Sequence, residues 1–304
     1  MYRVDGSFDQ TFFEGASCAF GVFDGVHLGH RYLIGAAKDT AQADGGKSVA
    51  LTFDIDPDEK FHPERLRKLM TNEERLEMLA DTGVDAVAVL PFTPEFSSSS
   101  PEVFLAKTFG SCVPAHLHVG HDFRFGVRAS GTVDDLNAWS AATGVQVHAH
   151  HLVSDDGAPI TATRIRLLLA DGHVEAANHL LGRNYFVTGK VERGRGEGEG
   201  LGFRTANFAV PDQMRTLGDG VYAAYAVVDG ERYKAAVNVG IPATFADRST
   251  STFEAHLLDF DGDLYGKRLR LEFTNWLRPM RKFDGVDELV EVVKGNIDWV
   301  RENL

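Results

Sequence analysis

The stretch Gly21-Val22-Phe23-Asp24-Gly25-Val26-His27-Leu28-Gly29-His30 decides how the first half of the chain folds. Residues 16–20, which precede it, form an apolar run of strand length. After it, apolar residues recur at helical spacing as far as Ala43. The pattern therefore predicts a strand, a glycine-rich turn and the start of a helix.

The turn has the features of an anion site. A helix start collects backbone N–H groups and the positive end of the helix dipole, and both favour a negative charge. His27 and His30 are three residues apart, so we expect them to project from the same side of the first helical turn. Gly29, which lies between them, lets a bulky ligand lie close to the backbone.

This arrangement suits nucleotidyl transfer. Attack on an α-phosphate builds negative charge on that phosphate and on the departing pyrophosphate, and fixed hydrogen-bond donors stabilise this charge without a covalent intermediate. The alternative is a plain helix N-terminus with two solvated histidines. The strand before the motif, the helix after it and the Phe23-Asp24-Gly25 lead-in favour nucleotidyl transfer.

The composition narrows the classes of protein to which the chain can belong. Its 304 residues are enough for two domains, and 43% hydrophobic with 25% charged residues is typical of a soluble globular protein. The net charge of −13 argues against a general nucleic-acid or membrane-surface binder. Cys18 and Cys112, the only cysteines, are too few for a disulfide framework or a zinc set. We expect a cytoplasmic protein, because the sequence shows neither a signal pattern nor an apolar run of membrane length, and its oligomeric state is left open.

Two patterns divide the chain near residue 183. Before this point, strand-like and helical patterns alternate at residues 48–53, 73–80, 84–90, 115–119, 133–142 and 145–151. This alternation predicts an α/β domain over residues 1–183, a Rossmann-like nucleotidyltransferase domain with a parallel sheet.

From residue 184 on, short strands separated by turns replace the alternation. They lie at residues 185–191, 221–228, 233–239, 252–258 and 268–273. A long helix with an apolar stripe is predicted only at residues 286–300. We therefore expect residues 184–304 to form a small closed β-sheet with a terminal helix.

A second candidate for phosphate binding lies near the end of the first half. Thr161 and Thr163 begin a helical pattern, and their hydroxyl groups can cap the helix. Arg164 and Arg166 can then reach phosphate oxygens. An ordinary capped helix with solvated arginines explains these residues equally well.

A glycine-rich stretch in the second half suits a polyphosphate. Gly196, Gly198 and Gly202 would let backbone amides approach the phosphates. Thr205 and Asn207 follow and offer oxygen ligands for Mg²⁺. The alternative is a flexible loop, which the glycine pattern alone favours.

The motif at residues 21–30 resembles the first motif of the bacterial bifunctional riboflavin kinase/FMN adenylyltransferases, also called FAD synthetases. Residues 120–126, Gly-His-Asp-Phe-Arg-Phe-Gly, resemble the family's Gly-x-Asp-Phe-Arg-Phe-Gly segment, which lies near the flavin and adenine sites. The nucleotide- and flavin-binding residues that the resemblance implies here are Gly21, Phe23, Asp24, Gly29, Asp122 and Phe123.

The threonine–arginine motif also resembles a family segment. Thr163 and Arg166 match the family's Ile-Ser-Ser-Thr-x-x-Arg motif, which contacts the triphosphate. Thr161 and Ala162 stand where the family has two serines. The resemblance thus places Thr163, Arg164 and Arg166 at the nucleotide.

The second half resembles the family's kinase module, and the resemblance implies a six-stranded β-barrel domain over residues 184–304. The segment ending at Asn207 resembles Gly-Phe-Pro-Thr-Ala-Asn, with Arg204 in place of the proline, and Thr205 and Asn207 match its metal- and nucleotide-binding pair. Residues 252–260 resemble the family's Glu-x-His-Leu-Leu-Asp-Phe strand. The resemblance implies that Glu254 takes the proton from the ribityl hydroxyl of riboflavin, whereas on pattern alone it is a polar residue on a barrel surface.

Further departures from the family pattern lie in this half. Glu197 and Glu199 stand where basic or neutral residues are usual. The stretch Ile241-Pro242-Ala243 lacks the arginine that the family carries there.

The resemblance implies two ATP- and Mg²⁺-dependent steps. The second module would phosphorylate riboflavin to FMN with Glu254, and the first would adenylylate FMN to FAD with His27, His30 and Arg166. Two alternatives remain: a monofunctional FMN adenylyltransferase with a weakened kinase module, and a flavin-binding or regulatory protein without turnover.

Overall fold

The computed structural model describes residues 2–4, 10–64, 66–192, 203–211, 213–240 and 252–304. The chain divides into two compact units. The first comprises Met1–Leu66 with Thr71–Ala162, and the second comprises Arg67–Met70 with Thr163–Leu304. The domain boundary expected near residue 183 stays a prediction.

The first unit is built on a parallel sheet of six strands, in the order β1-β4-β3-β2-β5-β6. All neighbouring pairs in this sheet run parallel. The strands are β1 Tyr2–Val4, β2 Ser17–Phe20, β3 Ser48–Phe53, β4 Ala86–Leu90, β5 His116–Gly120 and β6 Gln146–His150. The predicted α/β fold with a parallel sheet is confirmed.

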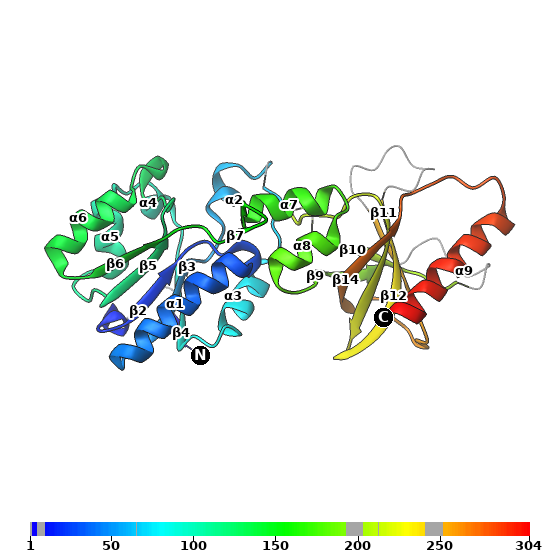
Figure 1. The fold of residues 1–304 in the computed structure, drawn as a ribbon, viewed down its shortest axis with the longest axis horizontal. Coiled ribbons are helices and arrows are strands. Elements are labelled where there is room, and N and C mark those ends of the chain that lie inside the picture. Colours follow the sequence, from blue (N-terminus) through cyan, green and yellow to red (C-terminus); the bar gives the residue numbers. More distant parts are fainter. Residues whose placement is uncertain (1, 5–9, 65, 193–202, 212, 241–251) are drawn as a thin grey trace. The chain divides into compact units, whose positions relative to one another are not determined.

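Helices cover both faces of this sheet, with α1 along one face and α5 and α6 along the other (Figure 1). The α-helices of the unit are α1 Leu28–Asp44, α2 Pro57–Phe61, α3 Asn72–Ala80, α4 Pro94–Ser97, α5 Pro101–Phe109 and α6 Val133–Thr143. Short 3₁₀ turns and a small hairpin complete it: η1 Gln10–Phe13, η2 Asp24–Val26, η3 Val127–Ala129, β7 Ser154–Asp155 and β8 Ala158–Pro159.

The two faces of the sheet carry different side chains. One face packs into an aromatic core with Phe104 and Phe109 of α5. Residues on the other face, such as Ala19 and Ala50, are small and fully buried, so α1 packs close to the strands. Because only the short turn η2 separates α1 from β2, the N-terminus of α1 lies at the carboxyl ends of the strands, where parallel sheets bind ligands.

A buried arginine on α3 holds the strand ends together. Arg75 is 1% exposed, and its guanidinium donates hydrogen bonds to the carbonyl oxygens of Val22 at 2.8 Å and Phe53 at 2.7 Å. It also donates to Thr52 Oγ1 at 2.5 Å. Burial lowers the pKa of Arg75, while the nearby carboxylates, Asp56 first among them, act in the opposite direction. These bonds fix the backbone just before the turn of residues 23–26.

Arg75→Met is expected to lower the free energy of unfolding by about 3 kcal/mol, since it removes the guanidinium that donates to the Phe53 carbonyl and leaves the Val22 carbonyl with Thr52 as its side-chain donor. Urea denaturation followed by circular dichroism measures this loss. Arg31→Met is the matched control, because Arg31 is exposed and its Nε makes a single 3.3 Å bond to the Val26 carbonyl. Equal losses in the two variants would contradict a structural role for Arg75.

The second unit contains a closed barrel of six strands, in the order β10-β13-β12-β11-β14-β9. All neighbouring pairs run antiparallel. The strands are β9 Tyr185–Glu192, β10 Ala206–Ala209, β11 Gly220–Val228, β12 Glu231–Gly240, β13 Thr252–Leu257 and β14 Arg268–Arg278. The predicted six-stranded barrel is confirmed, although the sequence pattern did not identify β10.

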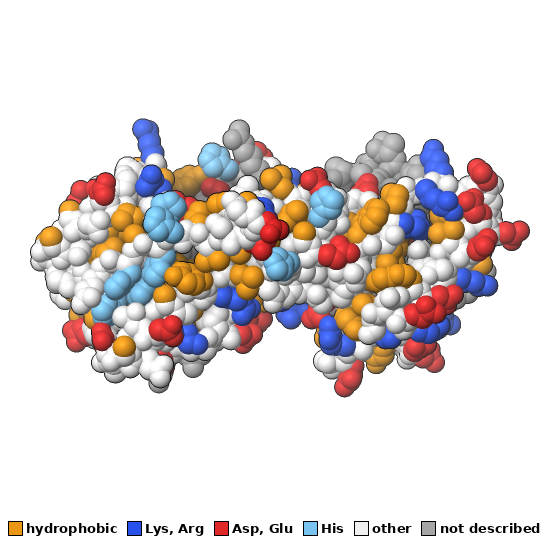
Figure 2. All heavy atoms as spheres, viewed as in Figure 1, with side chains coloured by type: hydrophobic (Ala, Val, Ile, Leu, Met, Phe, Trp, Pro, Cys, Tyr) orange, Lys and Arg blue, Asp and Glu red, His pale blue; other side chains and the backbone are white. Residues whose placement is uncertain are grey.

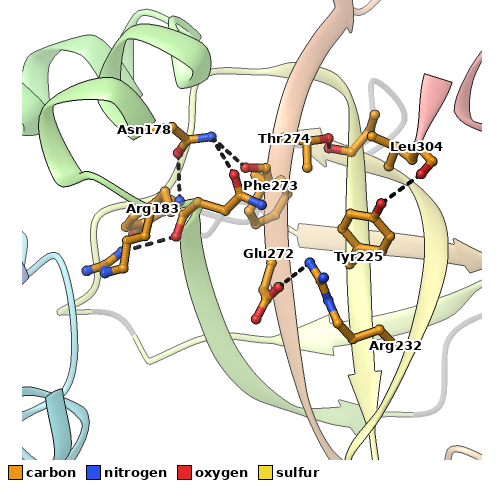
Figure 3. A network of polar contacts seen from close by, with 11 residues as sticks. Asn178, Arg183, Tyr225, Arg232, Glu272, Phe273, Thr274 and Leu304 are labelled. Carbon is orange, nitrogen blue, oxygen red and sulfur yellow. Dashed lines mark hydrogen bonds and ion pairs between the residues drawn. The ribbon is translucent and has the colours of Figure 1, made fainter. Parts of the chain in front are cut away.

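In the part of the second unit that the structure describes, three helices accompany the barrel: α7 Ala162–Ala170, α8 Val174–Leu181 and α9 Val286–Asn303. Asn178 ties α8 to the barrel, since its side-chain amide donates to the Phe273 carbonyl at 2.8 Å and its Oδ1 accepts from the Tyr185 N–H at 2.6 Å (Figure 3). Tyr225 ties the chain end to β11 by donating from its hydroxyl group to the Leu304 carbonyl at 2.9 Å. The predicted terminal helix is confirmed.

Candidate active sites

The turn after β2 has a costly backbone conformation. Phe23, Gly25 and Val26 have φ angles of 61°, 81° and 39°, all in the left-handed region. A bulky or β-branched residue there is strained, by about 1–3 kcal/mol each. The bonds from Arg75 and Thr52 to the Val22 carbonyl hold the chain at the start of this turn. Such strain is characteristic of functional sites.

The two histidines of the motif meet at the start of α1, as their spacing predicts. His27 is the N-cap residue of α1, and its Nδ1 accepts a hydrogen bond from the His30 N–H at 3.3 Å. The two rings stack with centroids 3.6 Å apart and planes 19° apart. Because Nδ1 accepts, we assign the proton of neutral His27 to Nε2, which makes that nitrogen a donor.

A cavity of about 240 Å³ lies at this helix start. Its lining includes seven residues that the sequence pointed to, namely Gly21, Phe23, His27, Gly29, His30, Asp122 and Phe123. The lining also includes Tyr32, His150 and His151, which the motifs did not identify. For His150 the available signal was its position, since it ends a parallel strand at the ligand-binding edge of the sheet.

Two residues that the sequence assigned to ligand binding, Asp24 and Gly29, also have local structural roles. Asp24 is 5% exposed and is not among the cavity-lining residues, and its charge favours the charged form of Arg75. At Gly29, a Cβ atom would come within 3.2 Å of the His27 ring. A side chain at this position would therefore press on the His27 ring, so glycine leaves room for that ring as well as for a ligand.

The second phosphate motif begins α7. Helix α7 starts at Ala162, directly after Thr161, so the predicted helix start is confirmed. Thr161 and Ala162 line the 240 Å³ cavity. Thr163, Arg164 and Arg166 belong to the second compact unit, and their contacts with a nucleotide stay a prediction.

Four histidines lie in a row on β5 and β6, and we call His116, His118, His148 and His150 the histidine row. The parallel register pairs His118 with His148, so all four side chains lie on the face that α1 covers. His116 Nδ1 lies 3.0 Å from His148 Nε2, and His118 Nδ1 lies 3.0 Å from His150 Nε2. At one end, His116 Nε2 lies 2.6 Å from Asp44 Oδ2 of α1.

The histidine row predicts acid sensitivity. Burial, followed by the charges of His148, His150 and His116, lowers the pKa of His118 to about 3. Burial also lowers the pKa values of His148 and His150. The folded state therefore favours neutral rings, so stability is complete above about pH 6.5 and is lost as the pH falls towards 3.

For His118 alone, we expect the unfolding free energy to fall by about 1.4 kcal/mol per pH unit within this window. His118→Asn removes the titrating group and keeps a donor near Nδ1, so its stability should change less steeply between pH 6.5 and 4.5. Urea titrations at several pH values give the slope for each protein. The same slope in both would exclude His118 as the source.

The second candidate site lies on the outer face of the barrel. Glu254 on β13 stands opposite Asn207 on β10 and Asn238 on β12 in the strand register. Directly opposed residues share a face, and all three are half-buried. They form a polar row across three strands. The sequence motifs did not identify Asn238 as a site residue, because only the strand register brings it next to Glu254.

A cavity of about 310 Å³ lies over this row. Glu254, Asn238 and Thr205 line it together with apolar residues of α9 such as Leu289 and Val293. The lining also includes Arg278, Arg281 and Phe283. Glu254 is thus a cavity residue rather than a solvated surface residue.

The segment before β10 is held against β13. His256 Nδ1 donates to the Arg204 carbonyl at 2.8 Å, and the Phe203 ring meets the His256 ring edge-on. The Arg204 side chain is exposed and lies 3.9 Å from Asp261. The backbone that leads to Thr205 is therefore held against β13 even though arginine replaces the family's proline at position 204.

Part of the kinase motif lies outside the described residues. This holds for Gly196, Gly198 and Gly202, for Glu197 and Glu199, and for Ile241-Pro242-Ala243. Within the described part of the chain, no group of three or more His, Cys, Asp or Glu side chains could hold a metal ion. Thr205 and Asn207 carry oxygen donors of the kind that Mg²⁺ prefers, and their role stays a prediction.

Comparison with known proteins decides the family. The FAD synthetase family model matches residues 9–164, and the riboflavin kinase family model matches residues 181–304. A bifunctional riboflavin kinase/FMN adenylyltransferase of Bacillus subtilis is 33% identical over 284 residues, covering 91% of this chain and 88% of the relative. The chain belongs to this bifunctional family.

A further relative and a solved structure are similar to this chain over nearly its whole length. The Pseudomonas fluorescens enzyme is 31% identical and covers 95% of this chain and 93% of its own length. A crystal structure titled a macrolide-efflux protein from Streptococcus pneumoniae has a TM-score of 0.86 and 29% identity, covering 100% of this chain and 99% of that one. Within the described residues, no helix has the length and apolar character needed to span a bilayer.

Proposed function

We propose that the chain makes FMN from riboflavin and ATP, and FAD from FMN and ATP. Residues 1–183 carry out the second reaction and residues 184–304 the first, in the cytoplasm. The partners are the small molecules riboflavin, FMN and ATP. The observation that carries the proposal is the stacked His27–His30 pair at the start of α1, in a cavity lined by the flavin motif.

In FAD formation, an FMN phosphate oxygen attacks the α-phosphorus of ATP, and the bond to the pyrophosphate oxygen breaks. His27 donates from Nε2 towards the charge that develops, and the N-terminus of α1 adds its backbone N–H groups and dipole. Arg166 pairs with the triphosphate. No residue forms a covalent intermediate.

In FMN formation, the ribityl 5′-hydroxyl attacks the γ-phosphorus and ADP leaves. Glu254 accepts the hydroxyl proton, within the cavity that it lines with Asn238 and Thr205. Thr205 and Asn207 would hold Mg²⁺, which neutralises charge on the phosphate oxygens when bound.

Labelled ATP tests both halves on the intact chain. With riboflavin, ATP and Mg²⁺, label from the γ-phosphate should enter FMN. With FMN, ATP and Mg²⁺, label from the α-phosphate should enter FAD, and pyrophosphate should be released. FAD from supplied FMN without any FMN from riboflavin would indicate the monofunctional alternative. Flavin binding without either product would indicate the regulatory one.

A further inference from the structure

The histidine row joins the surface to the first cavity. At one end, His116 pairs with Asp44 at the C-terminus of α1. At the other end, His150 lines the cavity that holds His27 and His30, and its ring meets the Tyr32 ring edge-on. Figure 2 shows histidine side chains gathered on this face of the first unit, over β5 and β6.

The carboxylate of Asp44 determines the proton positions in the outer pair of the row, His116 and His148. The ionised carboxylate of Asp44 can only accept, so the Nε2 of His116 carries a proton and donates to it. In the neutral form of His116, Nδ1 then accepts from the Nε2–H of His148. In this pair the hydrogen bond runs from β6 to β5.

In the inner pair, His118 and His150, the hydrogen bond runs in the opposite direction, from β5 to β6. His118 Nε2 is buried and has no hydrogen-bond partner among the residues that the structure describes. A buried N–H without an acceptor costs more than a bare lone pair, so the proton of His118 sits on Nδ1. Nδ1 then donates to His150 Nε2, and the proton of neutral His150 sits on Nδ1.

This assignment leaves His150 with a hydrogen-bond donor at the cavity. Within the described part of the chain, no acceptor is found for its Nδ1. We propose that His150 donates from Nδ1 to a phosphate oxygen of the ligand in the first cavity, and that His118 is the positioning residue that keeps the proton there. The inference rests on the proposed adenylylation, because it assigns a phosphate-bearing ligand to this cavity.

The chemistry of the pair fits a phosphate. A neutral donor can bond a phosphate oxygen without first having to lose or gain a proton. The lowered pKa values of His118 and His150 keep both rings neutral at physiological pH. The hydrogen bond from His118 fixes the tautomer of His150 and also orients its ring. The hydrogen-bond partners of metal-ligating histidines act in the same way.

Asparagine and glutamine variants separate this role from packing. The Asn amide lies near the position of His Nδ1, whereas the Gln amide lies near Nε2. For FAD formation, kcat/KM is expected to fall roughly tenfold to hundredfold in His150→Gln and clearly less in His150→Asn. The same order is expected for His118→Gln and His118→Asn, because only Asn places a donor near Nδ1.

His148→Gln is the matched control, because its amide keeps the donor to His116 and His148 does not line the cavity. It should form FAD at the starting rate. Riboflavin phosphorylation by the second unit reports on the integrity of each variant. Equal losses for Asn and Gln, or a loss in His148→Gln, would overturn the proposal in favour of packing.

The two proposals fail in different ways. If the starting protein forms no FAD, the proposed function fails. The inference is then judged by the dissociation constants of FMN and of Mg-ATP, measured by equilibrium dialysis. Weaker binding in the Gln variants than in the Asn variants would support it, and identical constants in all variants would overturn it.

Discussion

His27→Asn is expected to slow FAD formation by about 10²–10³-fold while the protein stays folded. The loss follows from the position of the ring, which is 5% exposed at the start of α1 and stacked on His30. Its Nε2–H is the donor that the turn presents to the developing charge. Single-turnover rates with saturating FMN and ATP measure the effect on chemistry directly.

The choice of asparagine separates catalysis from capping. His27 Nδ1 caps α1 by accepting from the His30 N–H, and the Asn side-chain oxygen can accept in the same way. His27→Ala loses the cap as well, which adds about 1 kcal/mol of destabilisation. Thermal unfolding should therefore distinguish the two variants, whereas both lose activity. A His27→Asn enzyme with an unchanged rate would remove this ring from the mechanism.

The strand, turn and helix around His27 were predictable because they depend on short-range patterns. A strand-length apolar run, glycines and a helical repeat each act within a few residues of one another. The left-handed φ angles of Phe23 and Val26 were not predictable, since neither residue favours them. They are imposed by bonds from residues far along the chain, such as Arg75 to Val22.

The histidine row is a feature that local sequence patterns could not predict. His118 and His150 are 32 positions apart, and their 3.0 Å contact depends on the parallel register of β5 and β6. No local pattern fixes that register, although the alternation did predict both strands. The same holds in the barrel, where the register alone brings Asn238 to Glu254.

Strand β10 was missed for a related reason. Its four residues, Ala206–Ala209, are too few to show an alternating pattern, and the preceding glycine-rich segment indicated a loop. Pairing with β9 and β13 makes it a strand and closes the barrel. Asn207 therefore stands on a strand opposite Glu254, not in a loop that continues the glycine-rich segment.

Glu254→Gln is expected to slow the conversion of riboflavin to FMN by about 10²–10⁴-fold, the range for loss of a general base. Glutamine keeps the size and the polarity of the side chain, so the row with Asn207 and Asn238 should stay paired. What disappears is the capacity to accept the hydroxyl proton. Rates of FMN formation with saturating riboflavin and ATP measure the loss.

Two comparisons decide whether the loss is chemical. Glu231→Gln removes a carboxylate from an exposed position at the start of β12, outside the cavity, and should leave the rate unchanged. FAD formation from supplied FMN should be the same in all three proteins, since that cavity is lined by the first unit. A Glu254→Gln rate close to the starting value would contradict proton removal by this residue. Catalysis would then rest on positioning and charge stabilisation, which phosphoryl transfer can use almost alone.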